Sequence, residues 1–295
     1  MSSTSTAPAE IPSQQQQQQQ QPIADLPSGD PIPSPSKPLT TPPNTLPLAT
    51  LLAKLPSSAN LFLSRLEKCM STPSGIDTVM LLLCYTSKLT ANVLTSGRVT
   101  TLLDKSSQPI ARKTLATLLA KRLNNLSALM SESRVILRLW ALLGIYSWGR
   151  SIVATPATSV AAKGLDYVRL ILCVLLQGLE NGAYLSFRGV MGWTPEQQGL
   201  AYKWSARFWG AFVGIEVGKL LAERVGRVQK KDGEEERRET REWKRKLAKS
   251  LAWAPLTVHW SVDGGLPGVT ELVVGALASV PGVIQMGDLW ETVSK

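Results

Sequence analysis

The sequence has one histidine and three cysteines among 295 residues, so it has few of the side chains that metal sites and many active sites require. The cysteines, Cys69, Cys84 and Cys173, are isolated and odd in number, which argues against a disulfide framework and against a zinc site. His259 stands alone in an apolar segment, where a structural role is favoured over that of a base or ligand. The sequence has no Gly-rich phosphate loop and no nucleophile elbow. We therefore predict a protein that is not an enzyme and that uses no cofactor or metal.

Long uninterrupted apolar runs are also missing. The longest apolar run without a charge is Leu272–Gly287, 16 residues that include Pro281. A helix needs about 18–20 residues to cross a membrane. Arg169 and Glu180 interrupt a longer apolar segment, but they lie on one helix face, where they could shield each other's charge. We expect a helical protein tightly associated with a membrane, with one or two spans. A soluble helical bundle is the alternative.

Negative charge is the scarcer sign. The chain has 32 Lys and Arg against 22 Asp and Glu, a formal net charge of +10, and the excess lies after residue 47. Such a charge favours an acidic partner, either nucleic acid or anionic lipid. Nine tryptophans accompany only four phenylalanines, and the amphipathic indole ring suits the boundary between hydrocarbon and lipid headgroups. We therefore predict anionic membrane lipids as partners, and no nucleic acid.

The composition changes sharply near residue 47. Residues 1–47 contain eight consecutive glutamines and are otherwise rich in Pro, Ser and Thr, which predicts a disordered Gln/Pro-rich tail. Residues 48–290 show no sustained β alternation, so we predict an all-α, membrane-associated helical bundle. Within it, 228–249 is a run of mixed charges that predicts a solvent-exposed helical insert. The other predicted helices cover about 58–70, 76–95, 109–150, 160–187 and 195–229, with a polar connection at 97–108 and helix breaks at Pro255 and Pro281.

The longest predicted helix is amphipathic. It covers 109–150, because no Pro or Gly occurs between Ile110 and Leu143. At 100° per residue its apolar side chains fall on one broad side, which continues through Ile136, Leu137 and Trp140. We call the first part of this side the leucine stripe, which consists of Leu115, Leu118, Leu119, Leu123, Leu126, Leu129 and Met130. The opposite side carries Lys113, Asn124, Ser127, Ser131, Arg134 and Arg138.

The same helix is cationic in its first half. Between Ile110 and Ser131 it has no acidic residue and four basic ones, Arg112, Lys113, Lys121 and Arg122. A helix of this kind lies in a membrane interface or packs in a bundle. Arg122 falls on the apolar side, where a dry core would exclude an unpaired guanidinium but a headgroup layer would accept it. We therefore predict that the leucine stripe and these four basic residues bind the membrane.

Small residues recur at every fourth position in two other predicted helices. Each glycine inside a helix costs about 1 kcal/mol relative to alanine, so the pattern predicts close approach of another backbone, as in small-xxx-small packing in a bilayer. Packing of the two helices on each other and self-association of the protein are both open interpretations. The residues concerned are Gly178, Gly182, Ala206, Gly210, Gly214 and Gly218.

Several short blocks resemble the peroxisomal biogenesis factor 11 (peroxin-11) family, in particular its filamentous-fungal branch. The resemblance covers about 61–290 and rests on the order and spacing of the blocks. The blocks are Pro73–Asp77, Leu83–Thr86, Leu137–Trp140 with Gly144–Gly149, Leu179–Leu185, Trp204–Trp209, Leu251–Trp253 and Leu256–Ser261.

This resemblance implies a protein of the peroxisomal membrane that remodels and elongates the organelle, so that it promotes peroxisome proliferation and fission. An amphipathic helix enters one leaflet in that family, and the stripe from Leu115 to Met130 matches this role best. The family also implies self-association, together with fission adaptors and a dynamin-like GTPase as partners. The alternative function is a pore-forming channel for small metabolites, with Glu180, Arg169 and Glu271 along a polar path.

Overall fold

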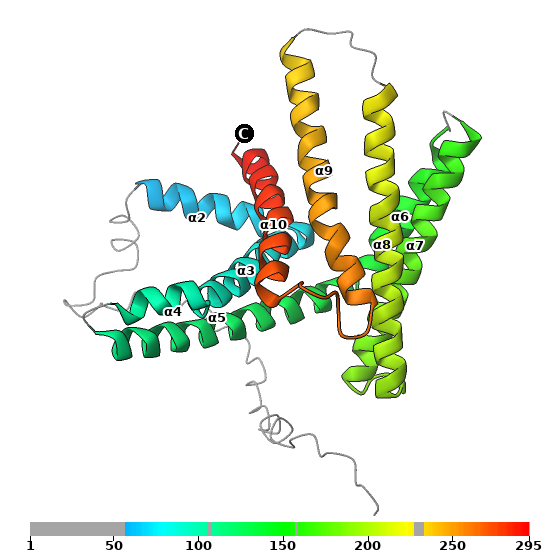
Figure 1. Cartoon of the computed structure of the whole chain (residues 1–295). Helices are drawn as coiled ribbons and strands as arrows, with labels where there is room; N and C mark the ends of the chain where they lie inside the picture. The colour runs from blue at the N-terminus through cyan, green and yellow to red at the C-terminus, as the bar shows by residue number, and fades with distance from the viewer. Residues whose placement is uncertain (1–56, 106–107, 157–158, 227–232, 295) are drawn as a thin grey trace, which may run out of the picture. The chain divides into compact units, whose positions relative to one another are not determined.

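All regular structure in the described part of the chain is helical (Figure 1). The computed structural model describes residues 57–105, 108–156, 159–226 and 233–294, and these belong to one unit, Pro56–Lys295. The all-α prediction is confirmed, whereas the predicted tail, 1–47, lies outside the described residues. The helices are α2 (Ser57–Cys69), α3 (Pro73–Leu94), α4 (Gly97–Asp104), α5 (Pro109–Arg138), α6 (Ala141–Ala154), α7 (Val160–Phe187), α8 (Pro195–Gly226), α9 (Glu234–Ser261) and α10 (Glu271–Val293).

Threonine and serine caps explain where several helices begin. The Ser159 hydroxyl accepts a hydrogen bond from a backbone N–H at the start of α7, and Thr270 does the same for α10. Thr72 caps α3, with Pro73 in the first turn. The predicted break between the first two helices is present, but it is shorter than expected, because α3 begins at Pro73 instead of Ile76. Gly75 permits the tight turn, because a Cβ there would collide with the Cys69 carbonyl oxygen.

Three boundaries differ from the sequence prediction. The connection expected at 97–108 contains the short helix α4. The helix expected over 109–150 is divided between α5 and α6 at Leu139 and Trp140. Pro255 and Pro281 lie inside α9 and α10 instead of ending them. A proline removes one backbone hydrogen bond, and here packing compensates: Pro281 itself is fully buried, and Leu256 beside Pro255 is fully buried too.

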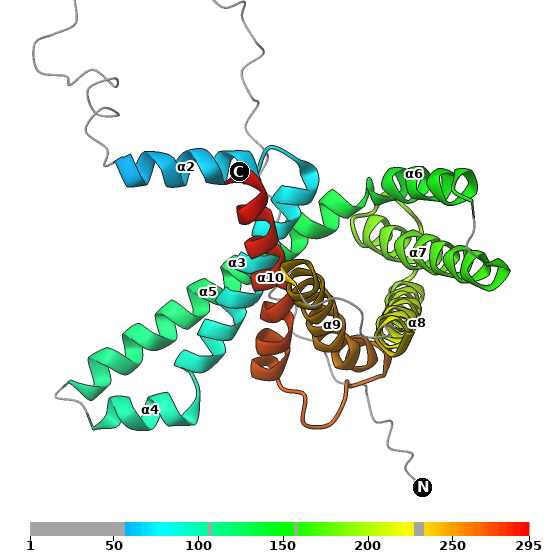
Figure 2. The same ribbon diagram turned by 90° about the horizontal axis from the view of Figure 1, so that it is seen from above.

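Each helix packs mainly on one or two neighbours. The order of contact is α5, α3, α10, α9, α8, α7 and α6, so α3 lies between α5 and α10 (Figure 2). Helices α10 and α3 approach each other closely, because a Cβ at Gly275 would lie 3.0 Å from the Leu89 Cα, and one at Gly282 3.2 Å from the Leu82 Cα. The apolar cluster of Leu256 with residues of α10 stands beside this contact.

Many large apolar side chains of the described unit are exposed. Among the fully buried side chains the largest are only Leu81, Leu256, Thr257, Pro281 and Cys69, whereas many Leu, Val and Trp side chains are exposed. Helices α7 and α10 are long and apolar enough to cross a membrane, and 33% of each apolar stretch is buried. Their length and composition indicate membrane association, although a helix in the core of a soluble protein can share both properties.

Candidate membrane-binding surface

Helix α5 is attached to α3 through small and polar side chains. Ala120 and Ser127 are the buried residues of α5. The Ser127 Oγ lies 3.5 Å from the Cys84 Sγ of α3 in a hydrogen bond. Two helical turns further on, Arg134 forms an ion pair with Asp77 of α3, with 2.8 Å between Nε and Oδ1. Only 12% of the arginine side chain is exposed. This side of α5 is the one that the sequence placed opposite the leucines.

The leucine stripe faces outward. Its exposed members are Leu115 (65%), Leu118 (44%), Leu119 (44%), Leu126 (37%) and Leu129 (57%). The remaining two, Leu123 and Met130, are half-buried, because they lie nearest the side that packs on α3. At 100° per residue, the buried Ala120 and Ser127 are about 120–140° from Leu115, which lies near the centre of the stripe. Among the described residues, the small and polar side of this helix packs on α3, whereas most of its apolar side is exposed.

Three of the four basic residues of the predicted surface are exposed, namely Arg112, Lys121 and Arg122. Lys113 is half-buried and forms an ion pair with Asp104 at the end of α4. Arg122 lies among the exposed leucines, as the helical spacing predicted. The surface is thus a row of leucines with free cations beside it, while Lys113 serves the contact with α4.

The apolar surface continues past the end of α5. Trp140, in the break between α5 and α6, is 70% exposed, and Leu143 is 67% exposed. Asn181 of α7 donates a hydrogen bond of 3.2 Å to the Leu139 carbonyl at the break. Beside it, Arg138 and Glu180 form an ion pair of 3.1 Å. The first contact gives a hydrogen-bond partner to a backbone carbonyl at the end of the helix, and the second pairs the charge of Arg138.

The six small residues predicted to mediate close packing do not form one interface. A Cβ at Gly182 would collide with Trp193, and one at Gly210 would lie 3.2 Å from Thr257 of α9. At Gly178, Gly214 and Gly218 a Cβ would meet no atom within 4 Å, and Ala206 is buried. The two glycine lines of α7 and α8 therefore do not pack on each other.

The close helix contact is instead between α10 and α3, which the sequence analysis missed. The signal was present in the sequence, since α10 places Gly275, Ala278, Ser279 and Gly282 on one side, and all four are buried. The helix break expected at Pro281 hides this pattern, because it separates Gly282 from the other three residues.

The three residues of the alternative polar path lie in separate ion pairs. Glu180 pairs with Arg138, Glu271 pairs with Lys88, and Arg169 pairs with acidic residues of α7 and α8. Glu180 lines a cavity of about 320 Å³, but Arg169 and Glu271 do not. We call this cavity the hub cavity. Its other lining residues include Asp77, Tyr85, Arg134, Arg138, Trp209, Trp253 and Trp260. Burial raises the pKa of the Tyr85 hydroxyl above its usual value.

His259 has a structural contact. Its Nδ1 accepts a hydrogen bond of 2.9 Å from the Leu266 N–H, and the ring lies so close to Gly265 that a Cβ there would collide with it. Gly265 also has a φ of 75°, so glycine is favoured twice at this position. Within the described ranges, no group of three His, Cys, Asp or Glu side chains could hold a metal ion.

A search against known protein families, curated proteins and solved structures finds no match for this chain. A function for this chain is therefore inferred from its own surface, in which the leucine stripe faces outward with basic residues beside it.

Proposed function

We propose that this protein shapes a membrane by inserting α5 into one leaflet. The observation that carries the proposal is the orientation of α5, whose leucine stripe faces outward while Ser127 and Arg134 pack on α3. In water this arrangement would leave five leucines exposed on one helix, which is an unusually large apolar surface. In a lipid interface the same leucines would be buried in the acyl boundary.

The energetics favour leucines as anchors and basic residues as lipid selectors. Each methylene moved from water into hydrocarbon contributes about 0.8 kcal/mol, so several leucines together dominate. A basic residue near an anionic leaflet contributes about 1 kcal/mol, and Arg112, Lys121 and Arg122 are free to do so. Because α5 has 30 residues, it would act as a wedge about 45 Å long on one side of the bilayer.

The peroxisomal location and the partners rest on the family resemblance. One structural observation supports it: the resembling blocks, far apart in the sequence, meet around the hub cavity. Asp77, Tyr85, Arg138, Glu180, Trp209, Trp253 and Trp260 line this cavity, and each comes from one of those blocks. We accordingly propose a peroxisomal membrane protein that promotes elongation, proliferation and fission, self-associates, and works with fission adaptors and a dynamin-like GTPase.

The test is flotation of the full chain with vesicles that contain anionic lipid, followed by inspection of vesicle shape. Leu119→Glu with Leu126→Glu should abolish the α5-dependent tubulation and weaken flotation, because two charges would enter the acyl boundary. The matched control is Thr117→Glu with Asn124→Glu, an exposed pair with the same spacing on another side of α5. Equal loss in both variants, or tubulation unaffected by the first, would refute the wedge.

A further inference from the structure

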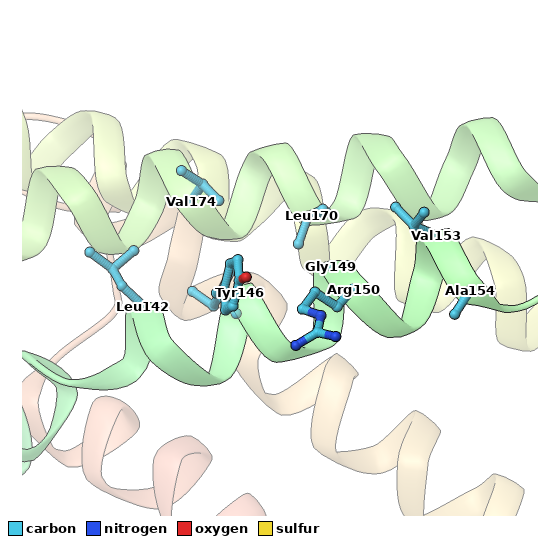
Figure 3. A pocket seen from close by; sticks show the side chains of 9 residues that line it. Leu142, Tyr146, Gly149, Arg150, Val153, Ala154, Leu170 and Val174 are labelled. Carbon is cyan, nitrogen blue, oxygen red and sulfur yellow. The ribbon is translucent and has the colours of Figure 1, made fainter.

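An apolar groove runs between α6 and α7 (Figure 3). Its volume is about 660 Å³, within the range of pockets that hold small ligands. Helix α6 contributes one wall through Leu142, Ile145, Tyr146, Gly149, Val153 and Ala154, and α7 contributes the other through Leu170 and Val174. The floor is where the helices touch, since a Cβ at Gly149 would lie 3.1 Å from the Leu170 Cδ2.

One charged residue lines the groove. Arg150 is exposed, and no acidic side chain of the described ranges forms an ion pair with it. Tyr146 lies one turn before it on the same side of α6 and is 66% exposed, so its hydroxyl is accessible. A guanidinium and a phenol one turn apart supply hydrogen-bond donors for a single anionic group such as a phosphate. The rest of the lining offers an occupant only apolar contact.

The dimensions match one lipid chain. From Arg150 to Leu142 the groove follows eight residues of helix, about 12 Å. The hydrocarbon of one leaflet is about 15 Å deep, half of the usual membrane core. A chain whose headgroup binds Arg150 would therefore lie along the groove over most of its length.

We propose that this groove binds one acyl chain of an anionic membrane phospholipid, whose phosphate is held by Arg150 and Tyr146. The inference rests on the membrane association in the proposed function, but it does not depend on insertion of α5. It gives the protein a second lipid contact, specific for headgroup charge, on helices separate from the leucine stripe.

Photolabelling in mixed micelles tests the site independently of α5. The full chain is held in a non-ionic detergent that contains a phosphatidylglycerol with a diazirine in one acyl chain, and the adducts are mapped by mass spectrometry. Adducts should concentrate on 142–154 and 170–174. Unlabelled phosphatidylglycerol should displace the label at about tenfold lower concentration than phosphatidylcholine does.

Matched variants decide whether the groove is the site. Val174→Trp should fill the groove and reduce labelling there about tenfold, whereas Leu175→Trp, at the next and similarly exposed position outside the lining, should not. Arg150→Glu should abolish the preference for phosphatidylglycerol, Arg150→Lys should keep it, and Lys244→Glu on α9 is the control for charge.

The inference is overturned if adducts spread equally over the exposed apolar residues of α8, if both tryptophan variants lose label equally, or if the two lipids compete equally. Its failure is distinguishable from that of the proposed function. Vesicle tubulation without labelling of the groove would refute only the lipid site, and labelling of the groove without tubulation would refute only the wedge.

Discussion

Replacing Gly275 with alanine is expected to destabilise the protein, although alanine is the better helix former. A Cβ at this position would lie 3.0 Å from both the Cα and the backbone N of Leu89, which is tighter than most real Cβ contacts, and these neighbours are backbone atoms that cannot rotate away. Helix α10 would have to move away from α3. Overpacking of this kind typically costs about 1–3 kcal/mol, and the gain in helix propensity returns about 1 kcal/mol. The net change is a loss of about 0–2 kcal/mol.

The control is Gly214→Ala in α8, where a Cβ would meet no atom within 4 Å. Here only the propensity gain of about 1 kcal/mol remains, so this variant should be more stable than the parent. The two variants should therefore differ by about 1–3 kcal/mol. For a domain of 150–250 residues, 1 kcal/mol shifts the Tm by about 2–4 °C, so a difference of several degrees is expected.

Thermal unfolding of the purified chain in one detergent, followed by circular dichroism, measures this difference. The reasoning fails if Gly275→Ala unfolds at the same temperature as Gly214→Ala or above it, because α10 would then not approach α3 as described. A lower Tm for Gly214→Ala than for the parent would also contradict the reasoning, because a Cβ there is expected to meet no atom.

Two further predictions concern charged contacts. Asp77→Asn should destabilise the protein by about 2–3 kcal/mol, somewhat less than the loss of one partner from a fully buried ion pair, because the Asp77 side chain is 30% exposed. Urea unfolding in detergent would measure this change. An unchanged midpoint would contradict a stabilising role for the pair with Arg134. The hydrogen bond from Lys203 lowers the pKa of Asp263 below its usual value, so its stabilisation of the loop before α10 is complete above the ordinary pKa near 4 and is lost as pH falls through the lower folded value. Protection factors for hydrogen exchange in 262–270, which correct for the intrinsic pH dependence of exchange, should therefore fall only at strongly acidic pH, and Asp263→Asn should remove that fall.

Local signals in the sequence predicted a large part of the fold. Helix α7 has the predicted bounds, Val160–Phe187, and α8 begins at Pro195 after Thr194, because serine and threonine caps are local and their effect does not depend on tertiary contacts. The prolines were misjudged because the compensation for a lost backbone hydrogen bond comes from distant packing. Pro281 illustrates this, since it lies inside α10 and is fully buried.

The sequence predicted which residues form the leucine stripe, but not which side of α5 packs on the rest of the protein. Helical spacing alone grouped the leucines of α5, and the structure leaves five of them exposed. Spacing could not show that Ser127 and Arg134 would be the packed residues, because their partners Cys84 and Asp77 lie more than 40 positions away in the chain. An amphipathic pattern indicates two unlike sides but does not indicate which of them the protein covers.

The place of α3 between α5 and α10 has a mechanical consequence. The backbones of α10 and α3 are in direct contact at Gly275 and Gly282, with no flexible side chain between them to absorb movement. Arg134 and Ser127 fasten α5 to the other side of α3. If α10 crosses a bilayer, as its length and composition allow, α3 would act as a rigid spacer that limits the depth to which α5 can insert. The membrane curvature that α5 produces would then depend on this fixed insertion depth as well as on the number of leucines that insert.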